Sequence, residues 1–149
     1  MITFLRTNSE NSDFRLLIKE LDAYLAITDG EEHAFYDQYN KVDSIKEVIV
    51  AYDENEPVGC GAIKAFDEQS AEVKRMFVKP ERRGERIAPQ ILTELETWAK
   101  ALGYEYCVLE TGKRQQPAIA LYTRSGYQPI PNYGQYIGMD NSVCMKKNL

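Results

Sequence analysis

The sequence predicts an α+β (mixed α/β) fold with a central, mostly antiparallel sheet of about six to seven strands and helices on both faces. Short apolar runs separated by polar, turn-rich stretches fill the first half of the chain, which is typical of an antiparallel meander. The second half alternates strand-like runs with helical periodicity. Because 149 residues is a usual size for one domain, we expect a single domain over residues 1–149.

The first predicted elements are a strand and an amphipathic helix. Residues 1–7 alternate apolar and polar side chains, and the polar stretch 8–12 supplies oxygen atoms that can cap a helix. Helical spacing then continues to about Thr28, and Gly30 suits a left-handed helix end. The apolar stripe of this helix consists of Phe14, Leu17, Ile18, Leu21 and Leu25.

The segment 31–40 mixes aromatic and acidic residues without a clear period, so it is either a short helix or a loop. We assign it to the substrate side of the molecule, with Phe35 and Tyr36 as candidate substrate-binding residues. The alternative is a surface helix whose Phe35 and Tyr39 cover the core. His33 is the only histidine, and no array of cysteines or carboxylates surrounds it, so the sequence predicts neither a metal site nor a histidine-based triad.

The remaining elements follow from apolar runs, helical spacing and punctuation by glycine and proline. A turn-rich acidic stretch between the first two of these runs is typical of a hairpin. The predicted elements are strands over 48–52, 58–66 and 71–78, a helix over 89–101, a strand over 106–110, a helix over 118–124 and a strand near 142–146.

Composition and charge argue against several classes of function. No apolar run approaches the roughly 20 residues of a membrane span, and the N-terminal residues lack the order of a secretory signal, so we expect a cytoplasmic protein that does not enter a membrane. A net charge of −5 argues against nucleic-acid binding, which needs a basic surface. The cysteines are odd in number and lie in apolar surroundings, which predicts buried, reduced thiols at Cys60, Cys107 and Cys144.

The stretch 72–88 carries the strongest functional signal. A strand ends before Pro80, a basic turn follows, and the next helix begins near Ala88 with Pro89 in its first turn. Unpaired amides and the dipole of a helix N-terminus attract anions, so this turn is a candidate phosphate site; the alternative is a solvated charged loop. The basic residues that we place at this turn are Lys74, Arg75, Lys79, Arg82, Arg83 and Arg86.

Two motifs resemble those of the GNAT superfamily of acetyl-CoA-dependent N-acetyltransferases. Residues 83–88, Arg-Gly-Glu-Arg-Ile-Ala, resemble its Arg/Gln-x-x-Gly-x-Gly/Ala signature. Residues 109–111 and 115–127, with Ala-Ile-Ala-Leu-Tyr and Gly-Tyr, are similar to its second signature, a strand followed by a helix and a turn. The resemblance covers about Val48 to the C-terminus. It implies a GNAT-like fold whose sheet splays near its middle, where acetyl-CoA lies.

The resemblance implies acetyl-CoA as co-substrate, without a metal, and it implies which residues bind it. Arg86 stands where the signature usually has glycine, so a close approach of the phosphates requires that its side chain turn aside. Gln115 takes the place of a polar asparagine and can both cap its helix and touch the pantetheine arm; the alternative is capping alone. The implied cofactor-binding residues are Met76, Phe77, Val78, Arg83, Gly84, Glu85, Arg86, Ile87, Ala88 and Gln115.

Acetyl transfer to an amine needs a base for the ammonium and an acid for the leaving thiolate. The family often places a carboxylate where Glu72 stands, so Glu72 is the candidate base, direct or through water; the alternative is an exposed strand residue. Tyr122 occupies the tyrosine of the Leu-Tyr signature and is the candidate acid, whereas Tyr127 is expected in the core. A backbone N–H within residues 76–78 would stabilise the oxyanion.

The tail 129–138 is rich in turn residues and tyrosine, which predicts an ordered loop over the acceptor site. Tyr133 and Tyr136 are its candidate substrate-binding walls; the alternative is a packed surface loop.

The sequence therefore predicts an N-acetyltransferase that moves acetyl from acetyl-CoA directly to a primary amine, with a small molecule favoured over a protein. The alternative is a non-catalytic acyl-CoA-binding or protein-interaction module on the same fold, and the presence of both Glu72 and Tyr122 favours the enzyme. The acceptor stays open among amino acids, polyamines, aminoglycoside-like drugs and protein amines, and homodimer formation is equally open. Acidic residues within 29–37 favour a cationic or polar amine.

Overall fold

The computed structural model describes residues 1–30 and 45–149, and in this part of the chain it contains one seven-stranded sheet with the order β1-β2-β3-β4-β5-β7-β6. The strands are β1 (Ile2–Thr7), β2 (Glu47–Asp53), β3 (Glu56–Ala65), β4 (Ser70–Val78), β5 (Tyr106–Gly112), β6 (Gln128–Ile130) and β7 (Ser142–Asn148). The helices are α1 (Ser12–Asp29), α3 (Ile87–Ala101) and α4 (Gln116–Arg124), with short 3-10 helices η2 (Pro80–Arg82) and η3 (Gly134–Tyr136).

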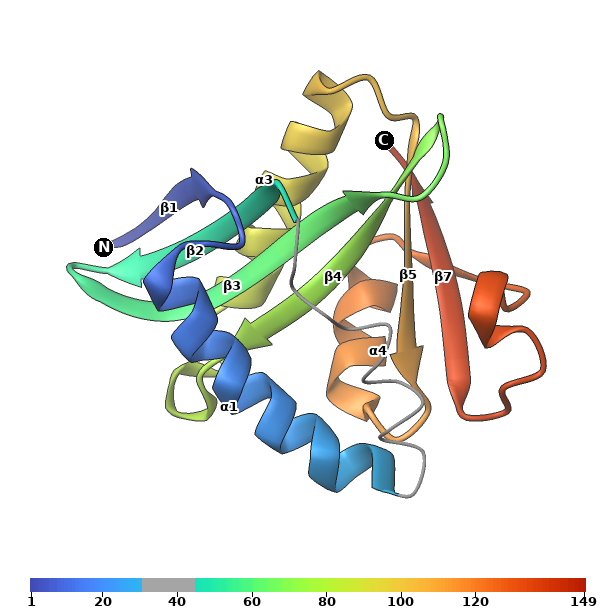
Figure 1. The fold of residues 1–149 in the computed structure, drawn as a ribbon, viewed down its shortest axis with the longest axis horizontal. Helices are drawn as coiled ribbons and strands as arrows, with labels where there is room; N and C mark the ends of the chain where they lie inside the picture. The colour runs from blue at the N-terminus through green and yellow to red at the C-terminus, as the bar shows by residue number, and fades with distance from the viewer. Residues whose placement is uncertain (31–44) are drawn as a thin grey trace.

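Helices cover both faces of the sheet (Figure 1). The apolar stripe of α1, which includes Phe14, Leu17 and Leu21, packs on one face against β2, β3 and β4, and the Asn11 side chain caps this helix by accepting a 2.9 Å hydrogen bond from the Phe14 amide. On the other face, α3 and α4 pack against the sheet through residues such as Leu95 and Tyr122. Each fully buried Leu or Phe contributes about 1.5–3 kcal/mol, so α1 and α3 are held by their apolar stripes rather than by helix propensity.

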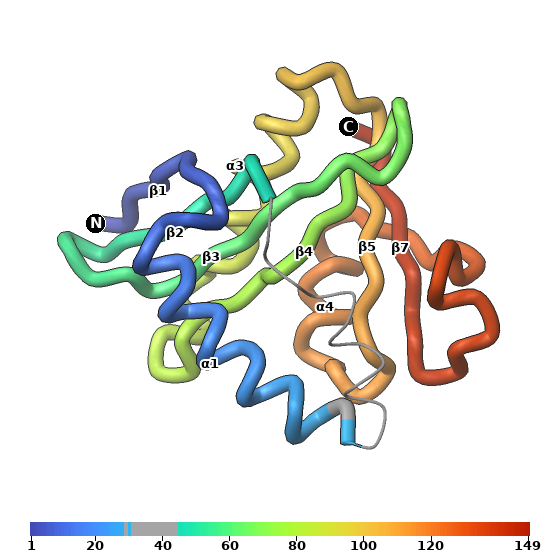
Figure 2. The backbone as a smooth tube through the Cα atoms, viewed as in Figure 1, coloured from blue at the N-terminus to red at the C-terminus, as the bar shows by residue number. Residues whose placement is uncertain are grey.

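All neighbouring strands are antiparallel except β4 and β5, which run parallel. Their pairing is short, because it joins only Ser70 to Tyr106, Ala71 to Cys107 and Glu72 to Val108. Beyond Glu72 the two strands diverge, as the smooth backbone trace shows (Figure 2). The mostly antiparallel, splayed sheet with helices on both faces is therefore confirmed, and the splay leaves a gap at the C-terminal half of β4.

The structure adds to the predicted elements at the C-terminal end. Residues 128–130, which the sequence analysis placed largely in a loop, form the short edge strand β6, and Gln128 and Ile130 lie opposite Lys146 and Cys144 of β7. Pro129 lacks a backbone N–H donor, which is tolerated in an edge strand. A proline also argues against a strand when only the sequence is considered, so this strand was not predicted. The strand predicted over 106–110 continues to Gly112, because β7 pairs with its full length.

Three further predictions concern the cysteines, a membrane-spanning helix and the segment that begins at residue 31. Cys60, Cys107 and Cys144 are free and buried, as expected. No helix within residues 1–30 and 45–149 has the length and apolar character needed to cross a bilayer. The predictions for Phe35 and Tyr36 concern residues outside the described part of the chain, as do those for His33 and the acidic residues from Glu31 to Asp37.

Candidate active site

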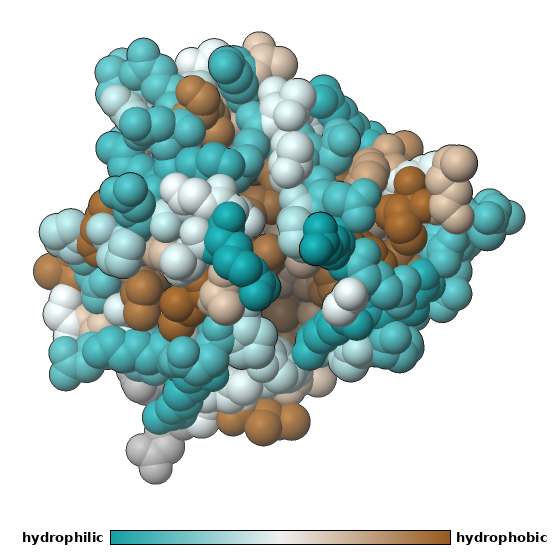
Figure 3. Space-filling model, turned by 180° about the vertical axis from the view of Figure 1, so that it is seen from behind, coloured by the Kyte–Doolittle hydropathy of each residue, from teal (hydrophilic) through white to brown (hydrophobic). Residues whose placement is uncertain are grey.

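A cleft lies where β4 and β5 part, between α1, α4 and the loop that contains η3. In the view from behind, the surface is hollowed near its middle, with hydrophobic residues at the base of the hollow and hydrophilic side chains around it (Figure 3). The cleft is lined by Leu21 and Leu25 of α1, residues 72–76 of β4, residues 110–112 of β5, Gln115, Ala118 and Tyr122 at and within α4, and Tyr136 of η3.

A bulge in β4 shapes one wall of the cleft. Arg75 has a left-handed backbone (φ 59°), and the register with β3 shifts between Cys60 and Ala62 opposite it. A residue with this φ costs energy when it is not glycine, so the surrounding structure must hold it. The side chain of Arg75 is held by an ion pair of 2.7 Å between its Nη2 and Asp22 of α1.

Glu72 lies on the same wall and is only 9% exposed. Its Oε2 accepts a 2.6 Å hydrogen bond from the hydroxyl of Tyr133, and its Oε1 lies 3.7 Å from Nζ of Lys74. Burial lowers the pKa of Lys74, and the negative charge of Glu72 opposes this shift. Glu72 is therefore a buried, oriented carboxylate of the cleft rather than an exposed strand residue.

Tyr122 reaches the cleft from α4 and is 7% exposed. Burial raises the pKa of Tyr122 above its ordinary value, and the negative charge of Glu110 raises it further. Tyr122 therefore keeps its proton throughout the physiological pH range. Tyr127 packs edge-on against the Tyr122 ring at 5.8 Å and lies in the core, as expected.

The last residues of β4 direct backbone groups into the gap. The Lys79 amide donates to Val58 of β3 at 3.0 Å, and successive N–H groups of a strand point to opposite edges. The amides of Met76 and Val78 therefore point away from β3 and toward the gap, whereas the amide of Phe77 faces β3. The side chain of Phe77 is buried with α1, so this residue supports the strand rather than the cleft.

The turn between β4 and α3 contains two residues with positive φ. Gly84 has φ 87°, and a Cβ placed on it would meet nothing within 4 Å, so the turn is open at this point. Arg86 caps α3 with φ 62° and has an exposed side chain. Ile87 is buried beneath the turn, and Ala88 is half-buried against the same core. The left-handed backbone at Arg86 explains why the signature that residues 83–88 resemble usually has glycine at this position.

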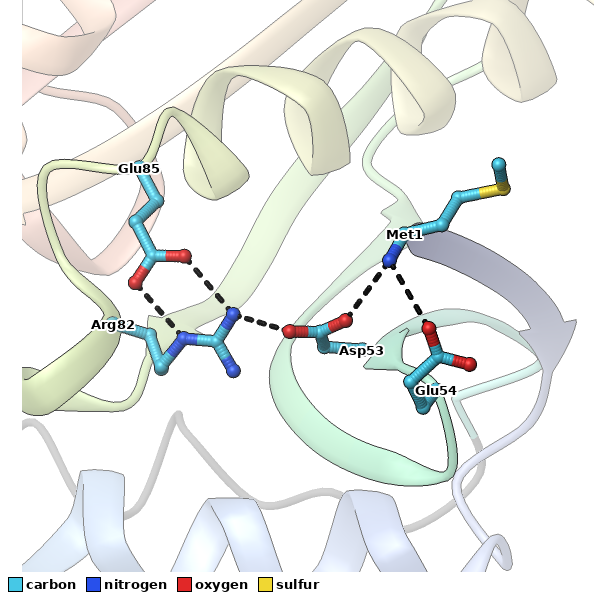
Figure 4. A network of polar contacts seen from close by, with 5 residues as sticks. All are labelled: Met1, Asp53, Glu54, Arg82 and Glu85. Carbon is cyan, nitrogen blue, oxygen red and sulfur yellow. Dashed lines mark hydrogen bonds and ion pairs between the residues drawn. The ribbon is translucent and has the colours of Figure 1, made fainter.

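The basic cluster that the sequence analysis placed at this turn is smaller than expected. Lys74 and Arg75 line the cleft instead, because β4 runs for several residues between them and the turn. Arg82 is occupied by acids: it lies 2.7 Å from Asp53 and makes two hydrogen bonds of 2.9 Å to Glu85 (Figure 4). The network continues to the amino group of Met1, 3.1 Å from Asp53.

Within the described part of the chain, no acidic side chain pairs with Arg83 or Arg86 of the turn. Nε of Arg83 donates to the Val78 carbonyl at 3.1 Å, and its guanidinium lies over the rings of Tyr24 and Phe77. Glu85, implied as a cofactor-binding residue, holds Arg82 through its carboxylate, so only its backbone is available to a phosphate. Because Asp53 and Glu85 offset its charge, Arg82 joins the turn to the end of β2 through these contacts.

Gln115 is placed at the cleft, but the proposed capping is wrong. It is the N-cap residue of α4, yet its side chain makes no capping hydrogen bond and instead donates to Oγ1 of Thr28 at 3.2 Å. Of the two candidate substrate-binding tyrosines, Tyr136 lines the cleft, whereas Tyr133 contacts it through Glu72.

Glu110 lines the cleft from β5 and was not predicted as a site residue. A charged residue directly after the apolar run 106–109 was the signal that could have found it. In the described part of the chain, no group of three metal-ligating side chains is close enough to hold an ion.

Arg86→Gly is expected to raise the melting temperature by a few degrees and to leave acetyl-CoA affinity within about tenfold. Replacing a left-handed non-glycine residue by glycine raises the free energy of unfolding by about 1–2 kcal/mol. The greater freedom of glycine in the unfolded chain offsets part of this gain. Glu54→Gly is the matched control, because Glu54 has φ 57° and lies in the β2–β3 turn. Thermal shift and titration calorimetry measure both; a far larger loss of affinity for Arg86→Gly alone would mean that this side chain grips a phosphate.

Comparison with known proteins agrees with this architecture. The model of the acetyltransferase (GNAT) family matches residues 14–127. An IAA acetyltransferase of Azospirillum brasilense is 38% identical over 136 residues, which cover 89% of this chain and 88% of the relative. An uncharacterised N-acetyltransferase of Bacillus subtilis, YsnE, is 35% identical over 66% of this chain and 67% of its own length.

Solved structures show the same fold. A Klebsiella pneumoniae protein assigned as an acyl-CoA N-acyltransferase has a TM-score of 0.84 and 30% identity, over 100% of this chain and 98% of its own. A GNAT acetyltransferase of Elizabethkingia anophelis with bound acetyl-CoA has a TM-score of 0.73 and 21% identity, over 99% and 98% of the two chains. With its splayed sheet, its β4–α3 turn and its family match, this chain belongs to the GNAT family of N-acetyltransferases.

Proposed function

We propose that residues 1–149 form one N-acetyltransferase domain that transfers acetyl from acetyl-CoA directly to a primary amine of a small molecule. The observation that carries this proposal is the cleft between β4 and β5, which brings a buried carboxylate of β4 and a protonated phenol of α4 to one gap. The two groups are those that the reaction needs, a base for the amine and an acid for the thiolate.

Acetyl-CoA binding would use backbone groups for the most part. The amides of residues 84–88 and the N-terminus of α3 suit the pyrophosphate, with Arg83 and Arg86 adding charge. The amides of Met76 and Val78 suit the pantetheine arm and the negative charge that develops on the acetyl carbonyl oxygen. Gln115 at the cleft wall suits the same arm.

The chemical step requires three proton movements. Glu72 accepts a proton from the acceptor ammonium, so that the nitrogen lone pair can attack the acetyl carbon. As the C–S bond breaks, the sulfur keeps the bonding electrons and takes the proton of the Tyr122 hydroxyl. The second proton that the nitrogen loses as it becomes an amide then restores the phenol, directly or through water. Neither group needs a metal to act as described.

The acceptor is expected to be a cationic or polar amine. Among the described residues, Glu72 and Glu110 line the cleft with Lys74 and Arg75, and Asp22 neutralises Arg75 from α1. With Asp22 included, the three carboxylates outnumber the two cations by one. One relative, 38% identical to this chain, is named an IAA acetyltransferase, which favours a small acceptor over a protein.

A panel of polyamines, aromatic amines, neutral amino acid amides and acidic amino acids, incubated with acetyl-CoA, tests this function by release of free thiol. We expect turnover of cationic or neutral amines, with kcat/KM falling as salt screens the cleft. Turnover of acidic amines alone, at a rate insensitive to ionic strength, would contradict the predicted acceptor. No turnover of any amine, with acetyl-CoA still raising the melting temperature, would contradict the enzyme itself.

A further inference from the structure

The hydroxyl of Tyr133 and the carboxylate of Glu72 form a contact that the reaction described above does not use. The two residues are 61 positions apart in the chain, and their hydrogen bond of 2.6 Å joins the η3 loop to β4. Glu72 is buried beside the cleft, and a buried carboxylate needs partners to remain charged. The phenol supplies one of them at one oxygen atom only.

The other oxygen atom of Glu72 has a different environment. Nζ of Lys74 lies 3.7 Å from Oε1, which is beyond hydrogen-bond distance, so the two groups attract each other without sharing a proton. Oε2 is thus fixed by a short hydrogen bond, and Oε1 is left with an electrostatic partner.

We propose that Tyr133 is a positioning residue that binds Oε2 of Glu72 and thereby presents Oε1 as the atom that takes the proton from the acceptor. This inference rests on the proposed amine acetylation. In the step, an N–H bond of the ammonium breaks, its proton forms a bond with Oε1, and the electron pair stays on nitrogen. The phenol keeps its proton, because burial and the adjacent carboxylate raise the pKa of Tyr133.

Tyr133 is itself held in place by aromatic neighbours. Its ring packs on Phe66 of the β3–β4 turn at 4.7 Å and on Tyr136 at 5.8 Å. Asn132 fixes the loop by donating to the carbonyls of Tyr136 and Met139. These contacts fix the position of the Tyr133 ring and therefore of its hydroxyl group.

Tyr133→Phe tests the role, because it removes the hydroxyl and keeps the ring contacts. The matched control is Tyr52→Phe, since the Tyr52 hydroxyl donates to Oδ2 of Asp13 at 2.7 Å, outside the cleft lining. The readout that needs no acceptor is the ¹³C titration of glutamate carboxyl carbons, with the Glu72 signal assigned by its loss in Glu72→Gln.

A hydrogen bond to the ionised form favours that form, so its removal makes protonation easier. We expect the titration midpoint of Glu72 to rise by about one pH unit in Tyr133→Phe and to stay unchanged in Tyr52→Phe. The acid limb of kcat/KM, measured with the amine of the panel that is turned over fastest, should move up by the same amount. Acetyl-CoA affinity should not change.

The other groups near Glu72 are the same in both proteins, so the difference reports the phenol. These groups are Lys74, Glu110, Tyr136, Cys144 and Lys64, which lies opposite Glu72 on β3. An unchanged midpoint and acid limb, with a melting temperature lowered as in Tyr52→Phe, would show a purely structural tyrosine and overturn the proposal. Should Tyr133→Phe not fold, a fluorinated tyrosine at this position is a stronger donor and should lower the midpoint; no movement would again overturn it.

Failure of the proposed function would give another pattern. Wild-type protein would then release no thiol with any amine of the panel, while the Glu72 midpoint still moved in Tyr133→Phe. That result would overturn the role of Oε1 in proton transfer and support the coupling of the two side chains alone.

Discussion

Tyr122→Phe is expected to lower kcat about 100-fold or more while acetyl-CoA still binds normally. A lost acid–base group costs typically 10²–10⁴-fold, and phenylalanine keeps the ring that packs in the core. Because burial and the charge of Glu110 raise the pKa of Tyr122, its proton is present at every pH below that raised value. The acid role should therefore persist to about pH 10 or beyond, and Tyr122 should not set an alkaline limb below that pH.

The control for this variant is Tyr127→Phe. Tyr127 is buried against the same helix, and its hydroxyl lies near Glu96 and Cys107 rather than in the cleft lining. Its loss should leave kcat within about twofold. Steady-state kinetics and thermal denaturation measure kcat and the melting temperature of both variants. If Tyr122→Phe kept its kcat but melted at a lower temperature, Tyr122 would be a core residue, and water would protonate the thiolate.

Gly84→Asp should abolish the rise in melting temperature that acetyl-CoA produces in the wild type. A ligand at 100 times its Kd stabilises a protein by about 2.7 kcal/mol, and a carboxylate about 4 Å from a phosphate charge costs on the order of 1–4 kcal/mol. The side chain would enter open space, so no clash with the protein explains the loss. Thermal shift with and without acetyl-CoA measures the effect.

Gly84→Asn separates charge from backbone strain. Gly84 has φ 87°, which is unfavourable for any side chain, and asparagine tolerates positive φ as well as aspartate does. We expect Gly84→Asn to lower the melting temperature of the free protein slightly and to keep most of the acetyl-CoA shift. A full shift in Gly84→Asp would place the phosphates away from this turn.

Much of the fold could be predicted from the sequence because it depends on neighbours along the chain. Pro80 cannot continue a strand, so β4 ends at Val78, and Asn11 caps α1 through an amide three residues away. The spacing of the apolar residues in α1 and α3 predicted both helices. The short strand β6 was harder, because Pro129 interrupts its pattern and only pairing with β7 makes it a strand.

The candidate site was predicted in part, and the errors share a cause. Lys74 and Arg75 were assigned to the phosphate turn because they are close to it in sequence, but an extended strand carries residues apart by about 3.3 Å each. The left-handed backbone of Arg75 and its ion pair with Asp22 depend on α1 lying across β4. No local pattern contains that information.

The sequence by itself determined the positions of Glu72, Gly84 and Tyr122 relative to their own strand, turn and helix, because hydrophobic period, proline and glycine act over a few residues. Only the tertiary structure decided which of these side chains meet. The parting of β4 from β5 brings Glu72 and Tyr122 to one cleft, and the C-terminal loop brings Tyr133 to Glu72. Such contacts follow from the pairing of distant strands, whose partners a single sequence does not specify.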